Sequence, residues 1–235
     1  MCGSGAPPVS VCVNRSVSRN FLCIRAPTCR KATSAIMFSP VSALRLESSV
    51  RLQAMVADLA YRIARKMNLP DDQVETIYAA GRLHDIGELS LPAAMLMKQS
   101  RLTKPEYMRV RDHCRVGYDM IRDVSCPWPI GEVVLQHHER LDGSGYPEGL
   151  KGSEISIATR VVAVADVVVA ICSDRPHKKA RSIEFALGEL ERGRTTLYDG
   201  DVVDACNDLF VQDGLGWPLG EQPQPPVFSE WVNQL

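Results

Sequence analysis

The chain has 235 residues and a formal net charge of −1, which is enough length for one sizeable hydrophobic core. Because its charges nearly balance, no overall field attracts it to a nucleic acid polymer or to a membrane surface. No apolar run reaches the roughly 18 residues that a membrane span needs. These properties favour a globular enzyme or regulator that acts without a membrane.

The eight cysteines form no recognisable framework. Four lie in the first thirty residues, the other four are scattered, and no CxxC pair occurs. This pattern excludes a zinc ribbon and is not that of a disulfide-stapled secreted domain. We therefore expect reduced thiols and a cytoplasmic location.

Residues 1–46 carry arginine and lysine but no aspartate or glutamate, and they show neither a helical nor a strand period. Polar residues interrupt their apolar stretches, so a secretory signal peptide is not indicated. An organellar transit peptide and an extension ahead of a start at Met37 both remain open. We expect 1–46 to be a disordered basic extension, 47–213 to form the folded domain, and 214–235 to be a loosely packed tail.

From Glu47 onward the chain shows helical periods. Apolar residues at three- and four-residue steps predict a first amphipathic helix that stops near Asn68: Leu52, Val56, Leu59, Ile63 and Met67. Asp71 or Asp72 is expected to cap the next helix, which leads into the segment GRLHDIG. Thr103 and Glu106 have the spacing of a capping box and open a helix toward His113.

Further helices are expected over about 115–123, 130–139, 183–192 with Ser182 as its cap, and 201–210. The β-branched run RVVAVADVVVAIC resembles a buried strand. Because strong strand signals are absent elsewhere, a strand here would have no partner, and we predict a buried helix instead. The expected fold is all-α, a bundle of about seven helices.

Six side chains could together bind metal: His84, Asp85, His113, His137, His138 and Asp166. Imidazole and carboxylate donors suit iron, manganese, zinc or nickel rather than calcium. Four of the five histidines belong to this set, and the fifth is His177. The sequence alone does not establish that the six converge.

Each of these residues also has a simpler interpretation. His84 and Asp85 taken alone are more readily a surface histidine beside a capping aspartate. His113 could be a helix C-terminal histidine favoured by the helix dipole, and His137 and His138 could be one buried and one exposed histidine. Asp166 is the strongest physical clue, because it lies inside an otherwise apolar run. A buried carboxylate needs a cation, a donor or a metal, so either an arginine or a metal ion must accompany it.

The ordered segments HD, H, HHERLDGSGYPEGLKG and VADVVVAICSDRP resemble the HD-GYP family of HD-domain phosphohydrolases, over about residues 46–210. The resemblance implies an HD-domain helical bundle with a GYP loop. It also implies hydrolysis of cyclic di-GMP to pGpG or GMP through a water activated by two divalent ions, iron or manganese. All six donors fall on family metal positions, and Asp85 becomes the catalytic, bridging carboxylate.

The same resemblance implies that Tyr146, Arg175 and Lys178 contact the cyclic dinucleotide, although Arg175 and Lys178 could equally form a solvated basic face. It further implies that the loop Gly145, Tyr146 and Pro147 can dock a GGDEF-type diguanylate cyclase.

The sequence departs from the family pattern at positions that surround the six expected metal ligands. Glu88 stands where the family has a phosphate-side lysine, and Leu52 and Ser48 stand where an upstream histidine or glutamate ligand is common. A third metal is therefore not expected. Two hypotheses follow: an active phosphodiesterase, or a catalytically weakened regulator that binds cyclic di-GMP or a cyclase partner.

Overall fold

The computed structural model describes residues 40–124, 126–175, 178–219, 225 and 228, with side chains from Ser49 onward. Within these residues the chain forms helices and loops and no β-strand. The helices are α1 (Pro40–Lys66), α2 (Asp71–Leu83), η1 (Ile86–Ser90), α3 (Ala93–Leu96), α4 (Lys104–Arg111), α5 (His113–Ile121), α6 (Ile130–Gln136), η2 (Gly152–Glu154), α7 (Ile157–Cys172), α8 (Ile183–Arg192) and α9 (Gly200–Val211). The predicted all-α class is confirmed.

The predicted helix starts are partly confirmed. Thr103 and Glu106 form the complete capping box at the start of α4, and the Ser182 side chain accepts a hydrogen bond from the Phe185 amide at the start of α8. The cap predicted for α2 is wrong, since Pro70 occupies that position and makes no side-chain cap hydrogen bond. Asp71 lies inside the first turn instead and pairs with Arg65 at 2.6 Å.

The helix α1 begins at Pro40, before the boundary expected at Glu47. It ends at Lys66, and Asn68 adopts a left-handed φ of 54° just beyond that end. The expectations for residues 1–39, which include Met37 and four cysteines, lie outside the described residues, and so does His177. The division into three segments therefore stays a prediction.

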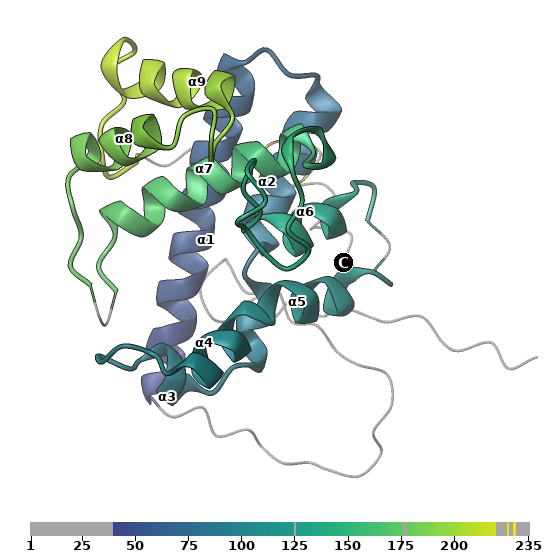
Figure 1. The fold of residues 1–235 in the computed structure, drawn as a ribbon, viewed down its shortest axis with the longest axis vertical. Helices are drawn as coiled ribbons and strands as arrows, with labels where there is room; N and C mark the ends of the chain where they lie inside the picture. Colours follow the sequence, from purple (N-terminus) through teal and green to yellow (C-terminus); the bar gives the residue numbers. More distant parts are fainter. Residues whose placement is uncertain (1–39, 125, 176–177, 220–224, 226–227, 229–235) are drawn as a thin grey trace, which may run out of the picture. The chain divides into compact units, whose positions relative to one another are not determined.

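The segment RVVAVADVVVAIC is helical, as predicted, and forms most of α7. The Ser156 side chain caps this helix by accepting from the Thr159 amide. Figure 1 shows α7 crossing α1, and α7 also packs against α2, α6, α8 and α9. A helix enclosed on so many sides has no solvent face to make polar, which explains why Asp166 alone interrupts the apolar residues from Val161 to Cys172.

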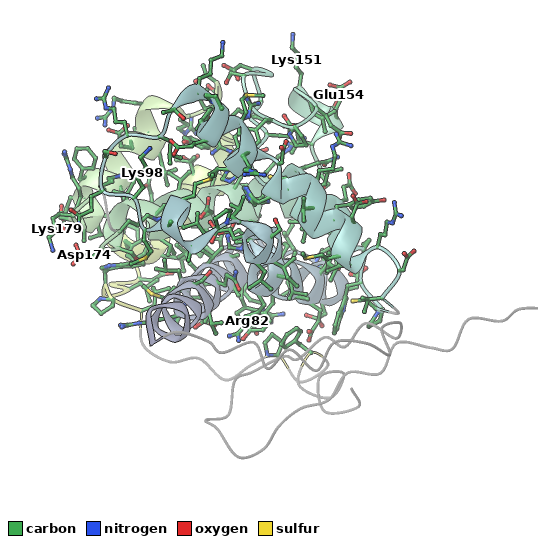
Figure 2. All side chains as sticks on the ribbon, turned by 90° about the horizontal axis from the view of Figure 1, so that it is seen from below. Arg82, Lys98, Lys151, Glu154, Asp174 and Lys179 are labelled. Atoms are coloured by element: carbon green, nitrogen blue, oxygen red, sulfur yellow. The ribbon has the colours of Figure 1, made fainter. Side chains whose placement is uncertain are left out.

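The hydrophobic core lies mainly between α1, α2 and α7, with buried side chains such as Leu59, Ile77 and Val162. Charged side chains lie outside it, and Figure 2 shows Lys151 and Lys179 pointing away from the ribbon. None of the described helices is both long and apolar enough to cross a membrane. The buried polar residues are therefore the exceptions that mark a site, and most of them lie where α2, α5, α6 and α7 meet.

Candidate metal centre and its loop

The HD dipeptide lies at the end of α2. His84 follows the last residue of the helix, and Asp85 precedes η1. The Nδ1 atom of His84 lies 2.8 Å from the Gly81 carbonyl oxygen, to which it can donate. Its Nε2 atom then faces the interior, 3.1 Å from Asp85 Oδ2 and 3.8 Å from Asp166 Oδ1.

His113 and His137 repeat this arrangement from two other elements. Each Nδ1 lies beside the carbonyl oxygen three residues earlier, at 2.6 Å for His113 and 2.9 Å for His137. The two Nε2 atoms lie 3.2 and 3.6 Å from Asp85 Oδ1 and 3.2 Å from each other. The two oxygens of Asp85 thus face different imidazoles, an arrangement suited to a carboxylate shared by two cations.

The position of His113 corrects one interpretation from sequence. His113 is the first residue of α5, directly after the turn that ends α4, so the helix C-terminal explanation is wrong. The predicted helix over 130–139 is also shorter than expected, because α6 ends at Gln136. His137 is its C-cap, with backbone angles that are still helical, and His138 follows it.

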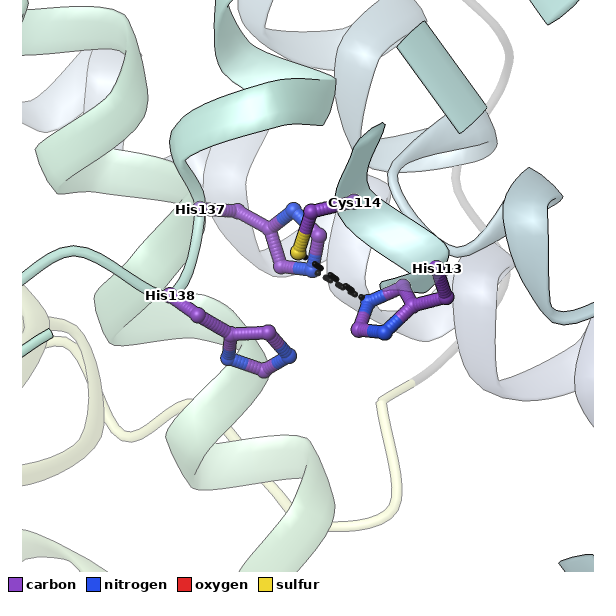
Figure 3. A group of neighbouring side chains, drawn as sticks. All are labelled: His113, Cys114, His137 and His138. Atoms are coloured by element: carbon purple, nitrogen blue, oxygen red, sulfur yellow. Dashed lines mark hydrogen bonds between the residues drawn. The ribbon is translucent and has the colours of Figure 1, made fainter. Parts of the chain in front are cut away.

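His138 and Asp166 complete the predicted set. The His138 ring centroid lies 4.2 Å from that of His137 and 5.2 Å from that of His113. Figure 3 shows His138 beside His113, His137 and Cys114, and one ligand atom from each of the four lies within 4.8 Å of the others. Asp166 is 8% exposed on α7 and lies near His84. All six predicted donors therefore converge.

The chemistry of this donor set fits divalent metal ions. Each of three imidazoles places Nδ1 beside a backbone carbonyl oxygen and turns Nε2 inward, the orientation that such a carbonyl gives to a metal-ligating histidine. The Nε2 atom of His84 is buried and makes no hydrogen bond of good geometry, although Asp85 Oδ2 lies 3.1 Å away. A buried nitrogen without a well-aligned partner costs free energy, and a cation between it and the carboxylate would remove that cost.

The electrostatics of the cluster centre on Asp85. Burial alone would raise its pKa, but the charges and hydrogen bonds of His84, His113 and His137 hold that pKa well below its usual range. Burial opposes charging of His84 and His113, yet Asp85 outweighs it and raises the pKa of these residues to about 9 and about 11. Burial lowers the pKa of His137 and His138.

Close packing of η1 against α5 brings Asp85 to His113. A Cβ atom at Gly87 would lie 1.9 Å from the His113 carbonyl oxygen, a distance that no side chain could tolerate. Glycine at this position of HDIG therefore lets the two backbones approach. The motif thus shapes the cluster in two ways, through the side chains of His84 and Asp85 and through the absence of a side chain at Gly87.

The loop after α6 is held by Glu139, which was not among the predicted site residues. Glu139 is 2% exposed. Its Oε1 accepts from the amides of Glu148 and Gly149 at 2.7 and 3.1 Å, and its Oε2 accepts from the Leu150 amide at 3.1 Å. Gly145 fits only because it lacks a side chain, since its Cβ would lie 2.4 Å from Glu139 Cα.

Tyr146 lies at the edge of the cluster. Its ring centroid is 4.7 Å from that of His138, and the Arg111 guanidinium carbon lies 4.3 Å from the Tyr146 centroid, a cation–π contact. Burial raises the pKa of Tyr146, so its hydroxyl stays a neutral hydrogen-bond donor near pH 7. Gly145 and Pro147 are half-buried.

Glu88 belongs electrostatically to the same site. Burial and the negative charge of Asp85 raise its pKa to about 7, while the positive charges of His113 and Arg175 oppose the shift. Arg175 is half-buried, and its Nε atom is buried without a hydrogen-bond partner. An arginine therefore lies close enough to the cluster to act on charges within it.

Lys178 is placed differently from Arg175. The two residues exchange backbone hydrogen bonds of 2.8 and 3.0 Å, but Lys178 is exposed, and no described contact joins it to the histidines. Asp174 and Lys179, which flank the pair, lie at the surface (Figure 2). Of the three predicted nucleotide contacts, Tyr146 and Arg175 are near the cluster, and Lys178 extends toward solvent.

Comparison with known proteins shows which family this chain belongs to. A model of the HD domain matches residues 36–202, more than two thirds of the chain. The chain belongs to the HD-domain family. Together with the curated relatives named cyclic di-GMP phosphodiesterases, this match confirms the resemblance to the HD-GYP branch.

Two curated relatives and one solved structure show how far the likeness extends. The cyclic di-GMP phosphodiesterase response regulator RpfG of Xanthomonas campestris is 38% identical over 152 residues, covering 64% of this chain and 40% of RpfG. The 3′3′-cGAMP-specific phosphodiesterase 1 of Vibrio cholerae is 32% identical over 166 residues, covering 67% and 37%. The HD domain thus spans about 40% of the length of RpfG.

Among solved structures, Bd1817, an HDG"Y"P protein from Bdellovibrio bacteriovorus, superposes with a TM-score of 0.58 at 16% identity, covering 74% of this chain and 58% of that one. At this identity the likeness supports the fold alone.

Three residues beside the cluster and its loop were not predicted from the sequence: Cys114, Glu139 and Arg111. Cys114 directly follows His113, and Glu139 directly follows the histidine pair, so adjacency to a donor was the available signal. Arg111 had no such signal, because its contact with Tyr146 joins α4 to a loop distant in sequence.

Proposed function

We propose that this HD domain is a metal-dependent phosphodiesterase that hydrolyses cyclic di-GMP to pGpG or GMP. The convergence of His84, His113 and His137 on the two oxygens of Asp85 carries the proposal. His84 and Asp166 would hold one divalent ion, and His113, His137 and His138 would hold a second. Asp85 would be a ligand of both ions. Iron and manganese suit this mixture of imidazole and carboxylate.

When bound, two such ions supply Lewis-acid stabilisation of phosphodiester charge and lower the pKa of a water toward neutrality. The side chains of the domain contribute orientation and charge. Asp85 stays ionised because its pKa is held low. The guanidinium of Arg175 would offset phosphate charge, and the neutral hydroxyl of Tyr146 would donate a hydrogen bond to the nucleotide. Lys178 would reach the ligand from the solvent side.

The substrate class rests on the relatives. RpfG is named for cyclic di-GMP and the Vibrio cholerae relative for 3′3′-cGAMP, so both cyclic dinucleotides belong in the test. The protein should be stripped of metal, reloaded with Mn²⁺ or with Fe²⁺ under anaerobic conditions, and assayed by chromatography of the products. We expect faster turnover of cyclic di-GMP than of 3′3′-cGAMP.

Two variants control this assay. Asp85→Asn keeps the size of the side chain but removes the shared charge, and we expect it to abolish turnover. Asp119→Asn changes an exposed carboxylate on α5 that pairs with Arg122, and it should leave turnover unchanged. Equal activity of Asp85→Asn and the unaltered protein would exclude the proposed centre.

One observation favours a second candidate function. Glu88 places an acid beside Asp85, where the family resemblance leads us to expect a phosphate-side lysine, so the site is less favourable to an anionic substrate. A regulator that retains metals and binds cyclic di-GMP or a diguanylate cyclase through Gly145, Tyr146 and Pro147 is the alternative. Bound metal and ligand without turnover in the same assay would favour it.

A further inference from the structure

Cys114 lies inside the histidine cluster without a role in the proposed reaction. The residue is fully buried, and its Sγ atom lies 3.5 Å from His113 Nε2. Figure 3 shows Cys114 grouped with the rings of His113 and His137. A buried cysteine is commonly a small core residue, so the neighbourhood of the sulfur decides whether it does more.

The close approach of two imidazole nitrogens beside Cys114 requires positive charge between them. The Nε2 atoms of His113 and His137 lie 3.2 Å apart, although both rings can donate through Nδ1 to backbone carbonyls. Two imidazoles with the proton on Nδ1 would turn lone pairs toward each other, which is unfavourable unless a proton or a metal ion lies between them. The unpartnered Nε2 of His84 also points into this interior.

Two of the spacings match those of neighbouring ligands around one ion. With metal–nitrogen distances of about 2.0–2.1 Å and a metal–sulfur distance of about 2.3 Å, neighbouring nitrogens at tetrahedral angles lie about 3.3 Å apart and nitrogen and sulfur about 3.6 Å apart, and the smaller angles of an ion that Asp85 also binds shorten both distances. The corresponding separations here are 3.2 Å between His113 and His137 and 3.5 Å between His113 and Cys114. With His138, all four ligand atoms lie within 4.8 Å of one another.

We propose that Cys114 is a sulfur ligand of the metal bound by His113, His137 and His138. On binding, the thiol gives its proton to solvent and the thiolate forms a bond to the ion. Because thiolate is a soft donor, this half of the centre should prefer zinc or ferrous iron to manganese. This inference rests on the metal centre of the proposed function and adds a ligand to it, but it does not depend on which substrate the protein hydrolyses.

Cobalt provides a direct test, because a thiolate ligand gives bound Co²⁺ an intense near-ultraviolet charge-transfer band that nitrogen and oxygen ligands do not give. The metal-free full-length protein is titrated with Co²⁺ and followed by absorption. We expect the band in the unaltered protein and in Cys126→Ser, the matched control outside the cluster. Cys114→Ser should bind Co²⁺ without the band.

Metal competition gives a second readout. Removing the sulfur should shift the preference of the protein from Zn²⁺ toward Mn²⁺ by about tenfold or more, the scale on which single site residues change metal affinity. The four cysteines of the first thirty residues are present in every variant, so only the difference from Cys114→Ser counts. Circular dichroism checks that each variant is folded, and Cys114→Ala repeats the comparison if the serine variant is not.

A band of undiminished intensity without Cys114, or no band in the unaltered protein, overturns the proposal. These results are separable from a failure of the proposed function. The band with no turnover of either dinucleotide would contradict the phosphodiesterase and support the sulfur ligand. Turnover with manganese but no cobalt band would support the enzyme and exclude Cys114 from the centre.

Discussion

At the scale of single residues, Asp85 organises the site. Its two oxygens lie within 3.6 Å of three imidazole nitrogens that come from the end of α2, the start of α5 and the end of α6. Glu88 is the residue that disturbs this arrangement, because it adds a second acid close to the first. The predictions about single residues therefore concern Glu88 and the histidines that contact Asp85.

Replacing Glu88 by lysine should improve an active phosphodiesterase. The change removes a carboxylate that repels phosphate and adds a cation that can bind it, and we expect kcat/KM to rise by about tenfold, or 1.4 kcal/mol. Steady-state kinetics with cyclic di-GMP measures this. Glu88→Gln serves as the control that removes charge without adding a cation, and its effect should be smaller. A loss of bound metal in both variants would instead assign Glu88 to metal binding.

Metal binding should depend strongly on pH. In the metal-free protein the pKa of His84 is about 9 and that of His113 about 11, so both imidazoles hold a proton at neutral pH that a metal ion must displace. The apparent metal affinity should therefore increase from pH 6 to pH 9, by about tenfold per pH unit for each proton released. Calorimetry in two buffers of different ionisation enthalpy counts the protons, and an affinity independent of pH would contradict this account.

At the scale of elements, the loop between α6 and α7 has a stabilising centre of its own. Glu139 binds the backbone amides of three consecutive residues, 148–150. The glycines of DGSGYPEG shape a chain that wraps around this carboxylate, and Gly145 passes against its backbone. The order of the GYP segment thus depends on the acid of HHE as much as on its own residues.

Glu139→Ala should loosen this loop. Three amides lose an ionised acceptor, which we expect to lower the free energy of unfolding by about 2 kcal/mol. Urea denaturation measures the loss, and hydrogen exchange of the amides of residues 148–150 should accelerate. Glu139→Gln keeps one carbonyl oxygen and should have a smaller effect. Unchanged exchange at these amides in Glu139→Ala would show that the loop is ordered by other contacts.

At the scale of the whole molecule, the donors connect parts of the helical unit that are distant in sequence. His84 and Asp85 follow α2, His113 begins α5, His137 and His138 follow α6, and Asp166 lies within α7. Ions held by all of them would link four helices across the core. The metal centre should therefore contribute to the stability of the fold as well as to its chemistry.

Chelation should reveal this contribution. A ligand present at 100 times its Kd stabilises the folded state by about 2.7 kcal/mol, so removal of one such ion should lower Tm by about 5–10 °C for a domain of this size. Differential scanning calorimetry with and without a chelator measures the change. Asp85→Asn, which should bind metal weakly, ought to show little response. An equal shift in both proteins would place the stabilising ion elsewhere.

Features that arise from local interactions and from composition could be predicted from the amino-acid sequence. The capping box of Thr103 and Glu106, the Ser182 cap and the helical state of the apolar run around Asp166 could all be predicted. Local signals failed where a neighbour was decisive, as at Asp71, which pairs with Arg65 instead of capping α2. The six donor types were also visible, but their convergence was not.

Which side chains meet depends on how the helices pack. His84 and Asp166 are far apart in the chain and yet lie 3.8 Å from each other, because α2 and α7 pack together. The packing of α5 against η1 and α6 buries Cys114, and the fold brings Arg111 of α4 to Tyr146 in the loop after α6. The period of a helix fixes which face is buried but not which side chains of another helix it will contact, and that contact decides which donors share a metal centre.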